Sequence, residues 1–289
     1  MQASKAAGTT SLKAEMTAGE KLDYIKSVVP ELGGFDGQVR LSAKHPMHVA
    51  WYSLQDHSIS INEHAIDTLY ALCIADPVHA VGGLRVIASH ELSHAESFVN
   101  PKFMAAMAAV AAKSFGNTEL AELLALRTGK VKSFYELFHS IPGEVQRREL
   151  VLSFQTVTET LEKMDMRVEE AAAEISAVAK TGFEPFIDSI ALLSVVLPKL
   201  ASAAMRDDRA EWESSLVPGR FLRDVAFGRW NDSGFVQLAS FLYPEIAEGV
   251  KSIATFDENE VVWRVGGRID AMAAALAGAK GGVAIRKDA

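Results

Sequence analysis

Two histidines and a glutamate within residues 86–98 have the types and the spacing of a metal centre. His90, Glu91 and His94 form the pattern H-E-x-x-H. On a helix, positions four apart lie on one face, one turn above each other, so both imidazoles can reach a single ion. Zinc accepts neutral imidazole nitrogen, and a catalytic zinc site has three protein ligands plus an open position. The pattern therefore predicts a zinc site in which Glu91 deprotonates a metal-bound water.

The alternative interpretation is that this five-residue pattern arises by chance, and its surroundings bear on the choice. Residues 86–88 and Leu92 are apolar, which gives the predicted helix a second, apolar face. A helix buried beneath a cleft requires such a face. Charged and metal-binding side chains on a buried helix are costly unless they share a partner. These surroundings favour bound zinc.

A third zinc ligand is needed, and the best candidate lies in residues 167–180. Glu170 and Glu174 are four positions apart and share one face of a predicted helix, and the alanines at 171–173 are small enough to let that helix approach the motif helix. If Glu170 binds the metal, Glu174 can accept a hydrogen bond from the far nitrogen of a ligand histidine and fix its tautomer. The alternative is a solvated acidic face, because Glu169 extends the same acidic run.

Composition limits the classes of protein to which the chain can belong. Its 289 residues, 49% of them hydrophobic, are enough for a large core in one large or two small domains. The net charge of -8, without a Lys/Arg cluster, argues against a nucleic-acid partner. The single cysteine, Cys73, excludes a disulfide framework and a finger-type zinc site.

The chain shows no segment that would send it to or across a membrane. Its first residues contain no apolar core of a signal peptide. The longest apolar runs, Phe103–Ala112 and Ile187–Leu197, are shorter than the ~18–20 residues that span a bilayer. We therefore expect a soluble, cytoplasmic protein with no membrane span.

The first third of the chain is expected to combine helices with a small sheet. Residues 1–18 are small and polar and predict a disordered tail, followed by a helix over 19–29 that ends at Pro30. Alternating or β-branched segments predict a small antiparallel sheet with strands over 38–42, 48–54 and 58–62. The histidines of this region are expected at the surface or in turns: His45, His48 and His57. A helix over 63–75, capped by Asn62, and the motif helix over 79–98 follow.

From residue 101 onward the pattern is almost entirely helical. Residues 144–180 predict one long helix or two, and 187–205 predict an apolar, central helix. The predicted class is α+β, predominantly helical, with a metallopeptidase domain over 19–205 and a helical C-terminal region, 206–289, packed on it. Aromatic anchors are expected in that region at Trp230, Phe241 and Trp263.

The order of these pieces resembles the HtpX-type and CAAX-prenyl-protease family of zinc metallopeptidases. The matching segments are SHELSHAES at 89–97, the acidic pair in 170–174 and TGFEP at 181–185. The resemblance covers roughly residues 45–205. It implies a zincin-like fold of the gluzincin class and a zinc-dependent endopeptidase. In that class His90, His94 and Glu170 would bind the metal, Glu91 would be the general base and Glu174 would support a ligand histidine.

This chain departs from the family pattern at three places. Ser93 stands where the family usually has glycine, and Glu174 where it usually has aspartate. The family's later His-Pro…Arg segment has its nearest counterpart in residues 216–220, which lack the histidine.

Two functional hypotheses follow. The first is an endopeptidase acting on a protein or peptide substrate that pairs with an exposed edge strand, His48–Leu54. Tyr135, His139 and Arg220 have side chains of the type that could stabilise the oxyanion. The second is a catalytically silent zincin-like scaffold that binds a protein partner, in which the metal is structural.

Overall fold

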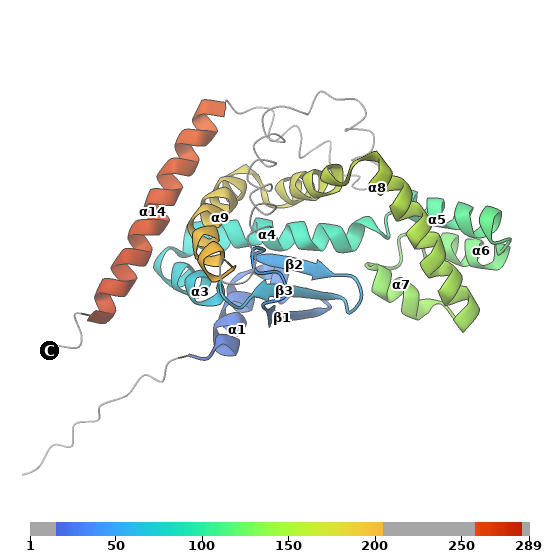
Figure 1. Ribbon diagram of the computed structural model, residues 1–289, viewed down its shortest axis with the longest axis horizontal. Coiled ribbons are helices and arrows are strands. Elements are labelled where there is room, and N and C mark those ends of the chain that lie inside the picture. The colour runs from blue at the N-terminus through green and yellow to red at the C-terminus, as the bar shows by residue number, and fades with distance from the viewer. Residues whose placement is uncertain (1–15, 205–257, 285–289) are drawn as a thin grey trace, which may run out of the picture.

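The computed structural model describes residues 16–204 and 258–284, apart from the side chains of 161–169, 171, 203–204, 258 and 280–284 (Figure 1). The predictions for the tail over 1–15 and for Trp230, Phe241 and Arg220 lie outside these residues. The described chain is α+β and predominantly helical, as predicted. Its elements are α1 Ala18–Val28, α2 Pro30–Gly33, β1 Gln38–Ser42, β2 Ala50–Ser53, β3 Ser58–Asn62, α3 Ile66–Ala75, α4 Pro77–Ser97, α5 Pro101–Ser114, α6 Thr118–Arg127, α7 Phe134–Ser140, α8 Glu144–Thr181, α9 Phe183–Ala204 and α14 Glu258–Ala284.

The sheet has the three predicted strands, but it is mixed, so the prediction of an antiparallel sheet was wrong for one pair. The strand order is β1-β3-β2, with β1 parallel to β3 and β2 antiparallel to it. The connection 43–49 is long enough to cross over β3. The side-chain nitrogen of Asn62 anchors this connection, because it lies within 3.1 Å of three of its carbonyl oxygens, those of His45, Pro46 and His48. All residues of β3 are buried, which suits the central position.

Asn62 has a different role from the one predicted, and Pro30 has a second role besides the predicted one. Asn62 was expected to cap the helix after β3, but α3 begins later, at Ile66, and has no side-chain cap. Pro30 was expected to end the first helix; α1 does end at Val28, and Pro30 also opens the short helix α2. Proline is tolerated at the first position of a helix because the backbone N–H it lacks would have no partner there.

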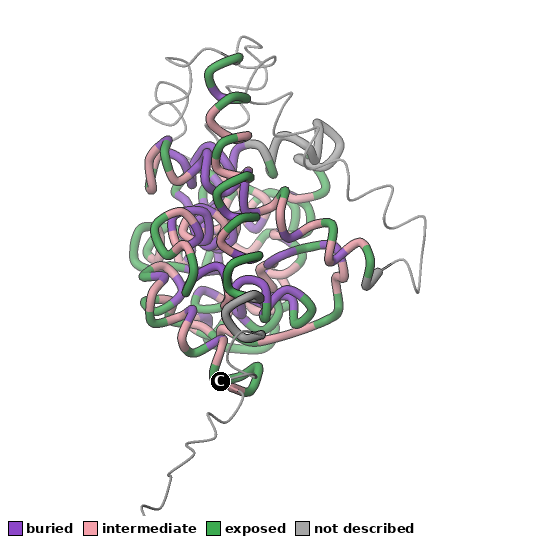
Figure 2. The backbone as a smooth tube through the Cα atoms, turned by 90° about the vertical axis from the view of Figure 1, so that its left-hand side faces the viewer, coloured by how far each residue is buried: buried purple, intermediate pink, exposed green. Residues whose placement is uncertain are grey.

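Helix α4, which carries the H-E-x-x-H pattern, runs through the middle of the molecule (Figure 1). It packs against β2 on one side, and α8 and α9 pack against it elsewhere. The buried residues are concentrated in the interior of the molecule, and the exposed turns lie at its periphery (Figure 2). Residues 144–181 form one helix, α8, which ends at Gly182 with a φ of 97°. That conformation favours glycine and stops the helix.

The C-terminal helix α14 packs on α9 and α3, with Val261, Met272 and Leu276 buried. Trp263 was predicted as a packing anchor, but its side chain is 79% exposed. Two positions along a helix amount to about 200° of rotation, so Trp263 points away from the face that carries Val261.

One described segment, Phe183–Ser202 within α9, is long and apolar enough to cross a bilayer by length and composition. The sequence alone had suggested a shorter apolar stretch here, Ile187–Leu197. In the fold this helix packs against α4, α8 and α14.

Candidate metal centre

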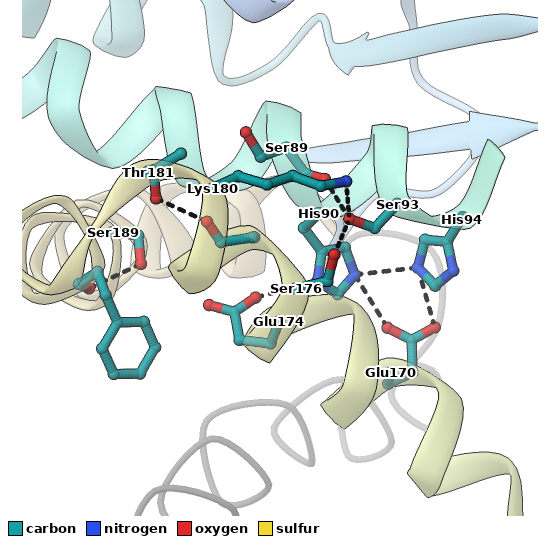
Figure 3. Close-up of polar contacts among 12 residues, drawn as sticks. Ser89, His90, Ser93, His94, Glu170, Glu174, Ser176, Lys180, Thr181 and Ser189 are labelled. Atoms are coloured by element: carbon teal, nitrogen blue, oxygen red, sulfur yellow. Dashed lines mark hydrogen bonds and ion pairs between the residues drawn. The ribbon is translucent and has the colours of Figure 1, made fainter. Parts of the chain in front are cut away.

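Helices α4 and α8 bring together the three residues that were predicted as metal ligands (Figure 3). His90 Nε2 lies 3.0 Å from His94 Nε2 and 3.2 Å from Glu170 Oε2, and His94 Nε2 lies 3.7 Å from Glu170 Oε1. Two ligand atoms at roughly 2.0–2.1 Å from a tetrahedral zinc ion are about 3.3 Å apart. The three distances bracket that value, so the donor set has the chemistry and the size to hold zinc.

Glu174 contacts the histidine on the side away from this cluster. Its Oε2 lies 3.0 Å from His90 Nδ1, and the residue is buried. In the neutral form of His90, which a metal requires, Nδ1–H donates to Glu174 and the unprotonated Nε2 is directed at His94 and Glu170. A carboxylate in this position fixes the tautomer that a metal requires. The methylene by which glutamate exceeds the aspartate of the family pattern does not prevent the contact.

The charges of the cluster favour a cation. Burial opposes the charged form of His90, but the neighbouring carboxylates of Glu170 and Glu174 outweigh it and hold the pKa of His90 well above its usual value. Burial also works against the charge on Glu170, yet hydrogen bonds from His90 and His94 hold the pKa of that carboxyl well below its usual range. A carboxylate-rich pocket that stabilises a proton on an imidazole can stabilise a divalent cation in the same place.

Glu91, the predicted general base, is buried between α4 and the sheet. Its Oε2 accepts a hydrogen bond of 2.8 Å from the backbone N–H of Tyr52 on β2. Among the described strands β2 forms one edge of the sheet, opposite β1. The motif helix and the predicted edge strand therefore meet at Glu91.

The environment of His57 was missed by the sequence analysis, which placed this residue at the surface or in a turn. It does lie in the turn before β3, with a φ of 47°, but it is only 7% exposed. Its Nδ1 lies 2.9 Å from Tyr52 Oη, and its Nε2 lies 2.9 Å from Asp36 Oδ1. Its ring stacks on Tyr135 at 5.6 Å. No local pattern signals these contacts, because Asp36 and Tyr135 come from other parts of the chain.

Two candidates for stabilising the oxyanion lie in this aromatic group. Tyr135 stacks on His57, and the ring of His139 lies 4.3 Å from that of Tyr135. Tyr135 thus lies against the β2–β3 turn, and His139 lies next to Tyr135.

Among the side chains that the structure describes, His90, His94 and Glu170 form the one group of histidine, cysteine and acidic residues placed to share a metal ion. Comparison of the chain with protein-family models, with curated proteins and with solved structures finds no match. The side chains of this site are therefore the basis for inferring a function.

Proposed function

We propose that the protein is a zinc-dependent endopeptidase with a zincin-like catalytic domain. The observation that carries the proposal is the convergence of three ligand atoms within 4.8 Å of one another beside a buried glutamate. Two of the ligands and the glutamate come from one helix, and the third ligand comes from a helix 76 residues further along the chain. The likeness of the sequence to the HtpX-type and CAAX-prenyl-protease family supports the same reaction.

The residues of the chain divide the chemistry among them. Bound zinc supplies a Lewis acid that lowers the pKa of a water molecule and polarises a carbonyl group. Glu91 takes the proton of the attacking water and returns it to the leaving amine. Glu174 holds the tautomer of His90, and the backbone of Tyr52 holds the carboxylate of Glu91.

Strand β2 gives the substrate a place to bind. In an antiparallel pair, successive residues direct their N–H and C=O groups to alternate sides of the strand. The Asn62 N–H donates to Val49 O, so Val49 and Trp51 face β3, and Ala50 and Tyr52 face the other side. The Tyr52 N–H on this side is occupied by the Glu91 carboxylate, so an extended peptide would pair with the remaining backbone groups of Ala50 and Tyr52 and lie next to Glu91.

Two histidines and one carboxylate can also hold iron(II) in oxygenases. The buried Glu91 next to the ligands favours hydrolysis, because a base at that position has a role in activating water. The catalytically silent scaffold is the second candidate, and the substitution of aspartate by Glu174 was one argument for it. The 3.0 Å contact between Glu174 and His90 weakens that argument.

Metal content and proteolysis together test the proposal. Elemental analysis of the purified chain is expected to find about one zinc, and Glu170→Ala is expected to lose it. Glu159→Ala, an exposed glutamate on the same helix, is the matched control and should keep it. Glu91→Gln should retain zinc and cleave unfolded casein 10²–10⁴-fold more slowly.

Each outcome separates the alternatives. A chain without zinc after refolding free of chelator would refute the metal centre, and iron in its place would favour the oxygenase type of site. A zinc-loaded wild type that cleaves no protein would support the silent scaffold. Casein cleavage by Glu91→Gln at the wild-type rate would remove Glu91 from the reaction.

A further inference from the structure

A second polar cluster joins α4 and α8 next to the metal centre, and its middle is Ser93 (Figure 3). The Ser93 hydroxyl donates to the carbonyl of Ser89 at 2.8 Å. Its oxygen lies 2.9 Å from Ser176 Oγ and accepts from Lys180 Nζ at 3.1 Å. A serine hydroxyl has one hydrogen to donate and two lone pairs. With Ser176 as donor, these contacts use all three, so the hydroxyl is fully satisfied.

We propose that Ser93, Ser176 and Lys180 form a clamp that sets the register of α8 along α4. The clamp thereby holds Glu170 and Glu174 opposite the histidines. This inference rests on the proposed zinc site. It assigns positioning residues, which act on the site by placing Glu170 and Glu174 rather than as ligands themselves.

The apolar surface between the two helices is poorly suited to setting a register. Around Ser176, the fully buried apolar side chains of α8 are mostly alanine: Ala172, Ala173 and Ala177, beside Ile175 and Val178. Apolar burial is non-directional, and short methyl side chains interlock little with a neighbouring helix. A shift of one residue moves a helix by 1.5 Å along its axis, which exceeds the roughly 0.5 Å tolerance of a metal site. Directional hydrogen bonds supply the missing constraint.

The clamp and the ligands attach the same two helices at separate points. Ser93 lies between His90 and His94 on α4, whereas Ser176 follows Glu170 on α8 by six residues, about 9 Å along the axis. Two points of attachment fix the rotation of α8 as well as its axial position.

Lys180 extends the clamp toward the end of α4. Its Nζ also donates to Glu96 Oε2 at 2.6 Å, so the lysine joins two residues of α4 from one position on α8. The carboxylate of Glu96 balances the charge of Lys180, and the clamp therefore adds little positive charge beside a cation site.

Burial shows why these hydroxyls need a partner. Ser93 and Ser176 are both fully buried. A buried hydroxyl without a hydrogen bond is unfavourable, and serine adds nothing to apolar packing that alanine would not supply. Ser93 is also one of the positions at which the chain departs from the glycine of the family pattern.

The test measures zinc affinity and metal-free stability in the full-length chain. Ser93→Ala and Ser176→Ala are each expected to weaken zinc binding about 10–100-fold in competition with a chelator, as loss of an outer contact to a metal site does. The double variant should bind zinc about as weakly as either single variant, because both substitutions remove the same contact. The matched control is Ser189→Ala on α9, a buried serine that bonds only within its own helix in the described contacts, to Phe186 O at 2.8 Å.

All three single variants should lower the thermal midpoint of the metal-free protein by similar amounts, whereas only the clamp variants should weaken zinc binding. Unchanged zinc affinity in Ser93→Ala and Ser176→Ala would overturn the clamp, as would an equal loss in Ser189→Ala. Cobalt(II) in place of zinc gives a second readout: the clamp variants should alter its visible absorption spectrum, and Ser189→Ala should leave it unchanged.

Lys180→Met keeps the test decisive if a buried serine variant fails to fold, because the lysine side chain is partly exposed. It is expected to weaken zinc binding several-fold. Its control is Lys199→Met, which removes a comparable bond between helices, from Lys199 to Thr68 on α3. Equal zinc affinities for these two lysine variants would overturn the clamp. A wild type that binds no zinc would instead refute the metal centre itself, and the clamp would lose its role with it.

Discussion

Asp188 lies where α4, α9 and α14 meet, and its burial gives the fold a specific dependence on pH. The side chain is 7% exposed, and Arg268 Nε on α14 donates to its Oδ1 at 3.0 Å. Burial raises the pKa of Asp188 to about 6, although the charges of His79 on α4 and of Arg268 act to lower it. Glu184, one turn earlier on α9, adds to the rise.

The direction of the effect follows from proton binding. The folded protein binds the proton of Asp188 more tightly than the unfolded chain does. The stability from this group is therefore fully present below the ordinary pKa of 3.8 and is lost as pH rises through about 6. At 1.36 kcal/mol for each pKa unit, the rise corresponds to about 3 kcal/mol of unfolding free energy.

The measurement is urea unfolding of wild type and Asp188→Asn between pH 4 and pH 8. Other carboxylates titrate in this range, so the informative quantity is the unfolding free energy of wild type minus that of the variant. We expect this difference to fall by roughly 2.5 kcal/mol from pH 4 to pH 7, slightly less than the full amount because pH 4 already lies above the ordinary pKa of 3.8. An asparagine that packs less well adds only a constant offset.

The control is Asp67→Asn, which removes an ion pair to Lys21 from a side chain that is 76% exposed. Its difference from wild type should stay under about 1 kcal/mol across the range. A difference for Asp188→Asn that is flat, or that rises with pH, would refute the account of its burial.

Gly83→Ala and Glu174→Ala test the contacts that α9 and α8 make with α4, and Gly267→Ala is the control for the first. Gly83→Ala should destabilise the protein by about 1–3 kcal/mol, because the added Cβ would lie 2.8 Å from the carbonyl oxygen of Asp188. Gly267→Ala on α14, with nothing within 4 Å of the added Cβ, should be neutral or stabilising by up to about 1 kcal/mol, and chemical unfolding compares the two. Glu174→Ala should weaken zinc binding roughly 10–100-fold in chelator competition, and an affinity equal to wild type would show that its contact with His90 is dispensable.

The parts of the fold that depend on local pattern could be predicted from the sequence. The spacing of His90 and His94 places both imidazoles on one face of a helix whatever the rest of the chain does. Alternating residues likewise indicated the three strands. The pairing of β1 with β3 could not be predicted in this way, since it depends on how the connection 43–49 crosses the sheet.

Glu170 is an intermediate case, because chemistry rather than pattern selected it. Nothing local requires a residue 76 positions beyond His94 to reach the same point. The need for a third ligand and the small residues beside Glu170 narrowed the choice to one acidic pair. His57 offered no comparable requirement, and its partners Asp36 and Tyr135 are distant in sequence, so its burial came only with the structure.

The buried residues of the motif helix α4 are distributed differently from the single apolar face that was predicted. The sequence predicts one apolar side, through Val86, Ile87, Ala88 and Leu92, and one polar side facing a cleft. The buried positions of α4 instead lie all around the helix and are mostly small: Ala80, Gly82, Gly83, Leu84, Val86, Ala88, Ser89, Glu91, Ser93, Ala95 and Ser97. A helix enclosed by a sheet and two other helices has no free side. Its small residues therefore determine how near each neighbour comes.

The small residues have different roles in the two halves of α4. Near its start, Gly82 and Gly83 let α9 approach until Asp188 lies against the α4 backbone. Near its end, Ser93 gives α8 a hydrogen-bonding partner at close range. Close approach by itself would leave α8 free to slide, and the carboxylates of Glu170 and Glu174 are useful to a metal only at one register. The small residue beside the histidines is therefore polar, whereas the pair at the other end of the helix needs only to be small.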